Sequence, residues 1–224
     1  IKGRTYDDYL RYMESNENAH VLEMDTVYND GSNGPFIQTF KFIGLGLMIA
    51  LLHDEKNAAS MNAGVDRLDN VLGRNLFQKY VEVLLTDRGT EFSGADGIEL
   101  RSDKTRRTRV FYCDPMQSGQ KGSLEVNHEL LRYILPKETD LRALGLVSQD
   151  ALNETISHIN SAPVESLAGK SPIEYVQFMA PDLWEGISKL GIREIPRKEV
   201  TLKPYLLKHW LDQEKPIRQE NQNI

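Results

Sequence analysis

The first part of the chain contains three segments rich in β-forming residues, followed by a segment with helical spacing. The β-rich segments cover residues 21–28, 36–43 and 45–52, and turn signals separate them, so they predict an antiparallel meander. The third segment is apolar nearly throughout, which is typical of a strand covered on both faces. Over residues 58–80 apolar residues recur at helical spacing, and Gly73 interrupts that predicted helix.

Short strands and helices alternate along the rest of the chain. Residues 81–86 and 108–113 each read as a short strand. A meander, a helix and then strands alternating with helices predict an α/β fold with a mixed sheet. Ser171, Pro172 and Glu174 form the capping-box pattern that starts a helix. The remaining predicted helices cover residues 6–13, 120–135, 149–160, 172–179 and a last segment opened by Pro204 that carries Leu206, Leu207, Trp210 and Leu211.

The composition is that of an ordinary soluble globular protein. Of the 224 residues, 40% are apolar and 27% are charged. A single cysteine, Cys113, excludes a disulfide-stapled secreted scaffold and favours a reducing cytosol. The longest apolar run, residues 42–52, is too short to span a membrane. Because Ile1 is not a start methionine and no signal peptide follows, we expect the numbering to begin inside a longer gene product.

Charge is distributed unevenly along the chain. The total is 27 − 33 = −6, which argues weakly against binding of nucleic acid. Residues 1–100 hold 9 Lys and Arg against 16 Asp and Glu, whereas residues 101–137 hold 8 against 4. A local basic segment on an acidic body can still attract a polyanion. A solvated hairpin is the simpler interpretation of this basic segment on its own.

Three acidic residues lie at positions that are informative about a functional site. Asp25 lies inside a predicted strand, where aspartate is disfavoured. Asp87 ends another strand, and open α/β sheets place their sites at such ends. Glu125 lies on the long predicted helix, on a polar face opposite Val126, Leu130 and Ile134. That polar face is formed by Lys121, Glu125, Glu129 and Arg132.

Carboxylates brought together from separate elements repel one another unless cations neutralise them or some are protonated. Hard oxygen ligands suit Mg²⁺ or Mn²⁺, and the His and Cys residues lack zinc spacing. Each acid also has an ordinary structural explanation. Asp25 alone fits a solubilising charge, Asp87 alone fits a turn, and Glu125 alone fits an ion pair on a solvated helix face.

The order and the local contexts of these acids resemble those of the DDE transposases and retroviral-type integrases. The closest resemblance is to the bacterial insertion-sequence group called the IS-thirty family. VLEMDTV at residues 21–27 is similar to its first-aspartate strand, and LLTDRGTEF at 84–92 to its "TDNGxEF" segment. The segments around residues 112–115 and 120–128 resemble "DP…QxGxxExxN". The match continues through residues 131–132, 135–141, 160–163, Leu167 and 171–174, and it spans about residues 4–179.

The resemblance implies a ribonuclease-H-like core, with a five-stranded mixed sheet flanked by helices. Its catalytic and metal-binding triad carries over to Asp25, Asp87 and Glu125, with two Mg²⁺ or Mn²⁺ ions as cofactors. Glu125 is chosen because it stands three residues after Gly122, and Glu129 is the alternative one turn away. The implied activity is divalent-metal-dependent cleavage of DNA strands, followed by strand transfer in transposition.

DNA, as element ends and target, is the implied partner, and we expect a homo-oligomer on DNA and no membrane association. Arg88 replaces the usual Asn after the second aspartate, so it either pairs with carboxylates, holds a phosphate or competes with a metal. His128 lies near the predicted site, although a structural role is common for such a histidine. The candidate phosphate contacts are Lys121, Arg132, Lys104, Arg106, Arg107, Arg109 and Arg88.

We expect three regions. Residues 1–18 form a helical segment before the core, and residues 19–180 form the catalytic core. Residues 181–224 form a helical extension whose apolar stripe docks on the core and whose end, after Gln213, frays. We expect the family's upstream helix-turn-helix region to lie outside this sequence, so this chain should bind DNA weakly and with little specificity.

Two other functions stay open. One is a metal-dependent nuclease of the same fold that does not join strands. The other is a non-catalytic scaffold that binds DNA or oligomerises, which the departure at Arg88 keeps open. For each of these functions we expect a cytoplasmic protein that associates with the bacterial nucleoid when bound to DNA.

Overall fold

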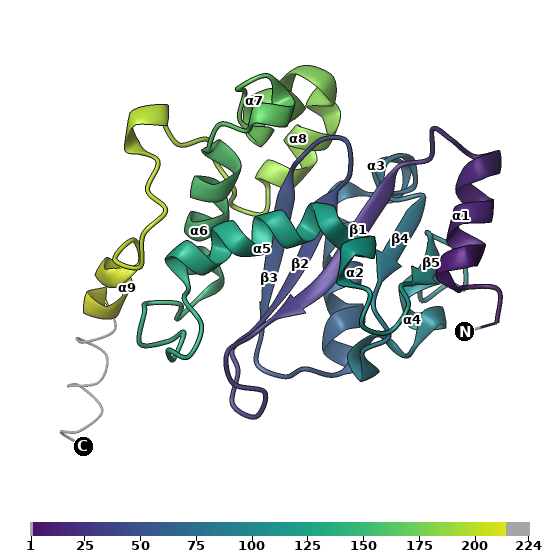
Figure 1. Cartoon of the computed structure of the whole chain (residues 1–224), viewed down its shortest axis with the longest axis horizontal. Helices are drawn as coiled ribbons and strands as arrows, with labels where there is room; N and C mark the ends of the chain where they lie inside the picture. The colour runs from purple at the N-terminus through teal and green to yellow at the C-terminus, as the bar shows by residue number, and fades with distance from the viewer. Residues whose placement is uncertain (1, 214–224) are drawn as a thin grey trace.

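A mixed five-stranded sheet forms the centre of the computed structural model, which describes residues 2–213 (Figure 1). The spatial order is β3-β2-β1-β4-β5. The first three strands pair antiparallel, and β4 is parallel to both β1 and β5. The order and directions confirm the predicted meander followed by two further strands. The strands are β1 (Val21–Val27), β2 (Phe36–Phe42), β3 (Met48–His53), β4 (Val83–Thr86) and β5 (Arg109–Tyr112).

Helices cover both faces of the sheet (Figure 1). Helix α5 crosses one face in front of β1 and β2, and α2 lies behind the sheet in the same view. Helix α6 packs on β3, and α8 packs on α2 and α3. The helices are α1 (Tyr6–Ser15), α2 (Ala58–Leu72), α3 (Arg74–Tyr80), α4 (Ala95–Glu99), α5 (Gly122–Ile134), α6 (Gln149–Ser161), α7 (Pro172–Met179), α8 (Pro181–Ser188) and α9 (Lys208–Gln213).

Glycines set several of the boundaries. Gly73, at φ 75°, separates α2 from α3, as the sequence predicts. Gly44 and Gly46 also have positive φ, at 81° and 72°, so the chain turns there and β3 begins at Met48, three residues later than predicted. β4 begins two residues later than predicted, because the N–H of Val81 donates to α3 and ends that helix.

The carboxyl-terminal helices belong to the same hydrophobic core as the sheet. Ser171 and Glu174 form the predicted capping box of α7. Leu207 is fully buried and Trp210 packs against the core, which confirms that the apolar stripe docks on its own chain. The last helix begins at Lys208 rather than at Pro204, because residues 203–207 form a turn. The predicted fraying after Gln213 lies outside the described residues. The short α4 and α8 are elements that the sequence pattern did not predict.

Side-chain amides close the outer edge of β3. The Asn160 amide accepts a hydrogen bond from the N–H of Met48 at 3.0 Å and donates to the carbonyl of the same residue at 2.6 Å. The Gln149 amide accepts from the N–H of Leu52 at 2.9 Å and donates to the carbonyl of Ala50 at 3.1 Å. These two amides take the place of a neighbouring strand, because they satisfy backbone groups that would otherwise be unpaired.

Backbone and aromatic side chains cover the opposite edge. The N–H of Tyr112 in β5 donates to the carbonyl of Arg4 at 2.9 Å, so the segment before α1 runs along this edge. Tyr9 and Tyr12 of α1 pack their rings against Phe111. Cys113, directly after β5, is buried, and burial raises its thiol pKa to about 12. None of the helices within residues 2–213 combines the length and apolar character needed to cross a bilayer.

We predict that Asn160→Ala lowers the free energy of unfolding by about 2–4 kcal/mol, because a fully buried amide is lost and two backbone groups of Met48 stay unpaired. Urea denaturation measures the change. Asn70→Ala, at an exposed position on α2, is the matched control and should change stability by less than about 0.5 kcal/mol. Equal effects of the two substitutions would contradict the edge-capping role.

Candidate active site

Two of the predicted acids, Asp25 and Asp87, meet at the carboxyl ends of neighbouring parallel strands. The β1–β4 register pairs Glu23 with Leu85, so two residues further along each strand the chain reaches Asp25 and Asp87. Asp87 directly follows Thr86, the last residue of β4. The sheet topology therefore brings together two carboxylates that are 62 residues apart in the sequence.

Both carboxylates direct one oxygen at a single ammonium group. The Lys121 Nζ lies 2.8 Å from Asp25 Oδ2 and 3.5 Å from Asp87 Oδ2. The other oxygens are held locally, because Asp25 Oδ1 accepts from the N–H of Thr26 at 2.7 Å and Asp87 Oδ1 from the N–H of Gly89 at 2.8 Å. The two Oδ2 atoms thus define one position for a cation.

The environment of this cation position is partly desolvated, because the Asp87 side chain remains 45% exposed. The Lys121 side chain is 7% exposed and that of Asp25 is 25% exposed. Burial lowers the pKa of Lys121, but the attraction of Asp25 and Asp87 outweighs it, so the net pKa is raised and the ammonium stays charged. Burial raises the pKa of Asp25, and the Lys121 ammonium opposes that shift. The lysine is therefore the counter-ion that keeps two carboxylates together.

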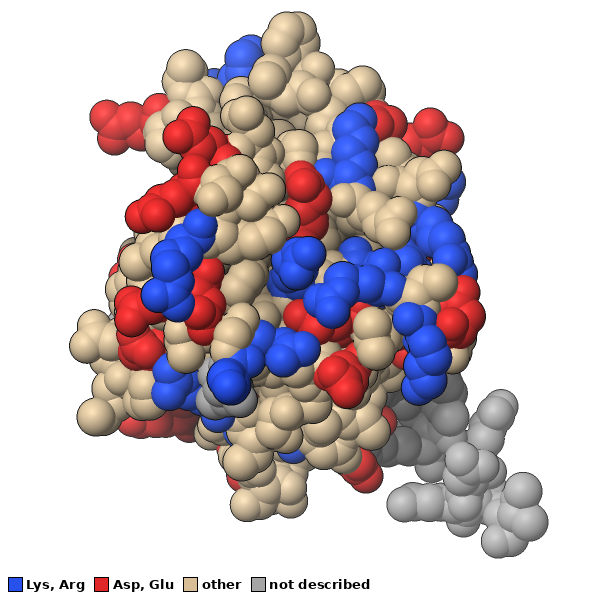
Figure 2. Space-filling view, turned by 90° about the vertical axis from the view of Figure 1, so that its right-hand side faces the viewer, with Lys and Arg blue, Asp and Glu red and all other residues tan. Residues whose placement is uncertain are grey.

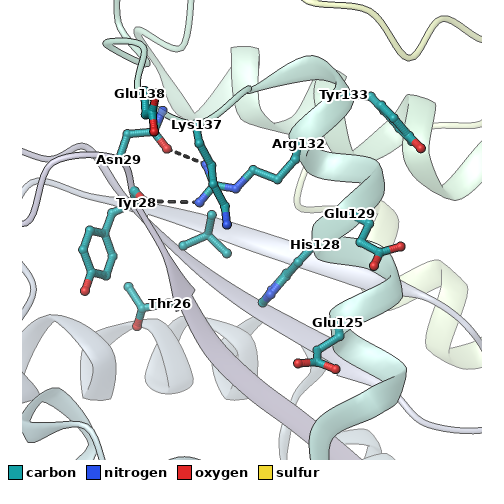
Figure 3. A pocket seen from close by; sticks show the side chains of 11 residues that line it. Thr26, Tyr28, Asn29, Glu125, His128, Glu129, Arg132, Tyr133, Lys137 and Glu138 are labelled. Carbon is teal, nitrogen blue, oxygen red and sulfur yellow. Dashed lines mark hydrogen bonds between the residues drawn. The ribbon is translucent and has the colours of Figure 1, made fainter. Parts of the chain in front are cut away.

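The third predicted acid, Glu125, lies one turn further along α5, in an open pocket between this helix and the end of β1 (Figure 3). Figure 3 shows its side chain and that of His128 extending from α5 toward β1, with Glu129 one turn above. Both glutamates are exposed. Within residues 2–213, no group of three or more His, Cys, Asp and Glu side chains is arranged to hold a metal ion.

The donor chemistry at the strand ends nevertheless fits a hard divalent cation. Asp25 and Asp87 present carboxylate oxygens, which Mg²⁺ and Mn²⁺ prefer, and these oxygens already converge on one positive charge. Glu125 supplies another carboxylate on the adjoining helix. The two aspartates thus fit such an ion as they stand, whereas Glu125 is not gathered with them.

Buried polar groups attach α5 to the sheet beside this site. Glu23, next to Asp25 on the same face of β1, accepts a hydrogen bond from the N–H of Leu124 at 2.8 Å. Lys41, its cross-strand neighbour on β2, donates to Asn127. Burial raises the pKa of Glu23 to about 7 and lowers that of Lys41 to about 8.

His128 forms a further polar contact between α5 and the sheet. Its Nε2 lies 2.9 Å from the Thr39 hydroxyl of β2. Burial, reinforced by the positive charges of Lys121 and Arg132, lowers the pKa of His128 to about 4. The imidazole is therefore neutral at pH 7 and serves as a hydrogen-bonding contact between helix and sheet.

Two residues at the start of α5 differ from the predicted facing of this helix, whereas Glu125, Glu129 and Ile134 agree with it. Lys121, predicted on the solvated polar face, is buried against the strand ends. Val126, predicted on the apolar face, is 59% exposed, and the buried apolar residues are Leu124, Leu131 and Ile134. The reason is that the polar groups of the sheet attract the start of the helix.

The basic hairpin that carries Lys104, Arg106, Arg107 and Arg109 lies away from the two aspartates. Arg109 begins β5 and pairs with Val83, whereas Asp87 follows the opposite end of β4, so the cluster is at the other end of the sheet. Arg107 is buried and donates to the carbonyls of Gly97 and Ile98, each at 2.7 Å. These bonds give Arg107 a structural role inside the hairpin.

The other predicted basic contacts of the hairpin are exposed. Arg106 pairs with Glu99 at 3.1 Å, Arg109 stacks over the ring of Tyr12, and Lys104 is exposed. Figure 2 looks onto the side that carries α1 and β5 and shows Lys and Arg side chains interleaved with Asp and Glu. Within this cluster, Arg106 and Arg107 therefore form ion pairs with acidic residues of the same chain.

Two further predicted basic residues have internal partners near the site. Arg88 pairs with Asp114 at 2.9 Å, so the cation on the two aspartates is Lys121 and not Arg88. Arg132 donates to Asn29 and to the carbonyl of Tyr28 (Figure 3). DNA contacts by these residues remain predictions.

The sequence interpretation missed the counter-ion role of Lys121, which it treated only as a phosphate contact. A signal was available, because Lys121 lies four residues before Glu125 and so belongs to the same end of the helix. Its neighbours Glu23 and Lys41 were also missed, because nothing in the sequence distinguishes a buried charge on a strand from an exposed one.

Sequence comparison finds similarity to bacterial transposases, although no protein-family model matches the chain. The transposase for insertion sequence element IS1086 of Cupriavidus metallidurans is 34% identical over 87 residues, covering 39% of this chain and 22% of that protein. Transposase InsI for insertion sequence element IS30A of Escherichia coli K12 is 26% identical over 137 residues, which cover 58% of this chain and 34% of that protein. The chain thus spans about a third or less of the length of these relatives.

Structure comparison finds retroviral proteins. A chain of the simian T-cell lymphotropic virus intasome, solved in complex with PP2A regulatory subunit B56 gamma, has a TM-score of 0.51 at 14% identity. The match covers 70% of this chain and 53% of that one. The catalytic core domain of BIV integrase has a TM-score of 0.48 at 18% identity, and the match covers 71% of this chain and 95% of that one. The predicted fold class, an integrase-like mixed sheet flanked by helices, is confirmed.

We predict that His128 makes stability depend on pH. Its pKa is about 4 when folded and about 6.5 in an unfolded chain, so the contribution is complete above pH 6.5 and is lost as the pH falls toward 4. The difference in unfolding free energy between the wild type and His128→Gln should be largest at pH 7 and should shrink toward pH 4. Urea denaturation at several pH values measures it, and a difference that does not vary with pH would contradict the prediction.

We also predict that Arg107→Ala lowers the free energy of unfolding by about 3 kcal/mol, because two carbonyls lose a buried charged donor. Lys104→Ala, in the same hairpin but exposed, is the control and should change it by less than about 0.5 kcal/mol. Urea denaturation measures the free energy of unfolding of both variants and of the wild type. A stable Arg107→Ala variant would mean that the guanidinium is available for another role.

Proposed function

The chain has a transposase/integrase core related to the IS30 group of transposases, and on this premise we propose that it catalyses phosphoryl transfer on DNA. The proposed reaction is divalent-metal-dependent cleavage of a strand at the end of a mobile element, followed by transfer of that end to target DNA. The observation that carries the proposal is the convergence of Asp25 Oδ2 and Asp87 Oδ2 on one cation position at the ends of two parallel strands.

In this proposal Asp25, Asp87 and Glu125 would hold the metal. When bound, Mg²⁺ or Mn²⁺ supplies positive charge to the attacking and leaving oxygens of a phosphodiester. The backbone N–H groups of Thr26 and Gly89 keep the two aspartates oriented through their Oδ1 atoms. Such pre-orientation lowers the cost of reaching the reacting geometry.

Both proposed steps are displacements at phosphorus. In cleavage, a water oxygen bonds to phosphorus while the bond from phosphorus to the 3′-oxygen breaks, and this oxygen leaves as a hydroxyl. In joining, that 3′-hydroxyl oxygen bonds to a phosphorus of the target, and the target 3′-oxygen leaves as a hydroxyl. The open pocket beside Thr26, Glu125 and His128 is the proposed position of the reacting strand.

DNA binding and assembly are also part of the proposal. We expect the chain to act on element ends and target DNA as an oligomer, in the cytoplasm and at the nucleoid. The supporting finding is its relationship to transposases and the likeness of its fold to a chain of an intasome. Lys104, Arg106 and Arg109, which lie at the surface, are the proposed phosphate contacts away from the site.

The test is Mn²⁺- and Mg²⁺-dependent cleavage and joining of a labelled duplex that carries an element end. Asp25→Asn, Asp87→Asn and Glu125→Gln should each lower the rate by at least about 100-fold, since each removes charge from the proposed metal shell. Glu129→Gln, exposed one turn away on the same helix, is the matched control and should stay within about threefold.

The outcomes separate the alternatives. Loss of activity in Glu129→Gln but not in Glu125→Gln would contradict the choice of glutamate. Cleavage without a joined product, with a free 3′-end supplied, would identify a nuclease. Metal-dependent activity that survives all three proposed ligand substitutions would contradict the proposed site.

A further inference from the structure

The ammonium of Lys121 contacts both of the aspartates that the proposed function assigns to a metal ion. It lies 2.8 Å from Asp25 Oδ2 and 3.5 Å from Asp87 Oδ2, and its side chain is 7% exposed. The Oδ1 atoms of both aspartates accept backbone hydrogen bonds and face away from it. The two Oδ2 atoms are therefore the carboxylate oxygens that either the ammonium or a metal ion can use.

Two cations cannot share these oxygens at low cost. Mg²⁺ binds oxygen at about 2.0–2.1 Å, so an ion on Asp25 Oδ2 would come within a few ångströms of the ammonium. At such a distance the two positive charges repel each other strongly, and the repulsion is twice as large for a divalent as for a monovalent ion. Occupation by lysine and occupation by metal therefore exclude each other.

We propose that Lys121 is an internal substitute for the metal, which holds Asp25 and Asp87 together in the metal-free chain and must leave before a divalent ion binds. The inference rests on the proposed function for the identity of the metal ligands. It goes beyond that function because it assigns Lys121 a competing position in the site rather than a contact with DNA.

The surroundings of Lys121 allow such an exchange. Lys121 ends a short 3-10 turn and directly precedes α5, whose start has no side-chain cap. The flanking Gly119 and Gly122 have open space around the positions where a Cβ would stand. A released ammonium would lie at the same end of α5 as Glu125, where the phosphates of a bound strand are proposed to pass.

The exchange is tested by metal binding without DNA. Lys121→Met removes the charge and keeps the side-chain length, so the site gains one net negative charge. Free Mn²⁺, followed by electron paramagnetic resonance during titration, should reveal a Kd at least about tenfold lower than that of the wild type. Lys189→Met, at an exposed position after α8, is the matched control and should leave the Kd unchanged.

Thermal unfolding supplies the second readout. Without divalent ions, Lys121→Met should unfold at a lower temperature than the wild type, because the two carboxylates lose their counter-ion. Mn²⁺ should raise the unfolding temperature more in the variant than in the wild type. Equal Kd values for the two proteins, or no binding by either, would overturn the inference.

A direct readout uses the wild type, so it does not depend on the folding of a variant. The ¹⁵N-ammonium resonance of Lys121, assigned by its loss in Lys121→Arg, should shift or broaden when Mg²⁺ is added, and an unchanged resonance at saturating Mg²⁺ would overturn the exchange. None of these measurements needs catalysis. Metal-dependent DNA cleavage with no lysine–metal competition would refute only this inference, whereas competition without cleavage would refute only the proposed function.

Discussion

One buried ammonium between two carboxylates is the interaction on which the architecture of this site depends. Parallel pairing of β1 and β4 forces Asp25 and Asp87 to the same end of the sheet, where their mutual repulsion would oppose folding. Lys121 cancels that repulsion and, from its place at the start of α5, fixes where the helix meets the sheet. The position of the helix and the charge balance of the site are therefore set by the same contact.

Helix α5 is attached to the sheet by polar contacts as well as by apolar packing. Toward the sheet it is held by Lys121, by the Glu23 hydrogen bond to Leu124 and by the contact of His128 with Thr39. Apolar packing is provided by residues such as Leu131. Hydrogen bonds and ion pairs depend on charge and geometry more sharply than apolar burial does. The position of this helix therefore depends on the charges of the side chains that hold it.

Local signals in the sequence were sufficient for most of the fold. Turn residues and β-forming runs predicted the antiparallel meander, Gly73 predicted the break between α2 and α3, and Ser171 with Glu174 predicted a helix start. The nearness of Asp25 and Asp87 was predicted through resemblance to a family, because contacts between distant residues leave no local pattern. The choice of Glu125 over Glu129 stays a prediction.

Other features could not be predicted because they depend on three-dimensional burial. Arg107 belongs to a basic run in the sequence, yet its guanidinium is enclosed by the hairpin and used on backbone carbonyls. Lys121 follows helical periodicity onto a polar face, yet its side chain meets the charged ends of strands instead of water. Periodicity locates a face, but it does not show what the face meets.

The amide side chains along β3 have a consequence for how copies of this core can meet. An open strand edge invites another chain to add a strand of its own, which leads to uncontrolled association. The side chains of Asn160 and Gln149 form hydrogen bonds with backbone groups on the β3 edge of the sheet. The segment at Arg4 runs along the opposite edge, at β5. Association of two such cores then has to use side chains on helices and loops. The sequences of those surfaces can vary while the sheet that carries the carboxylates stays the same.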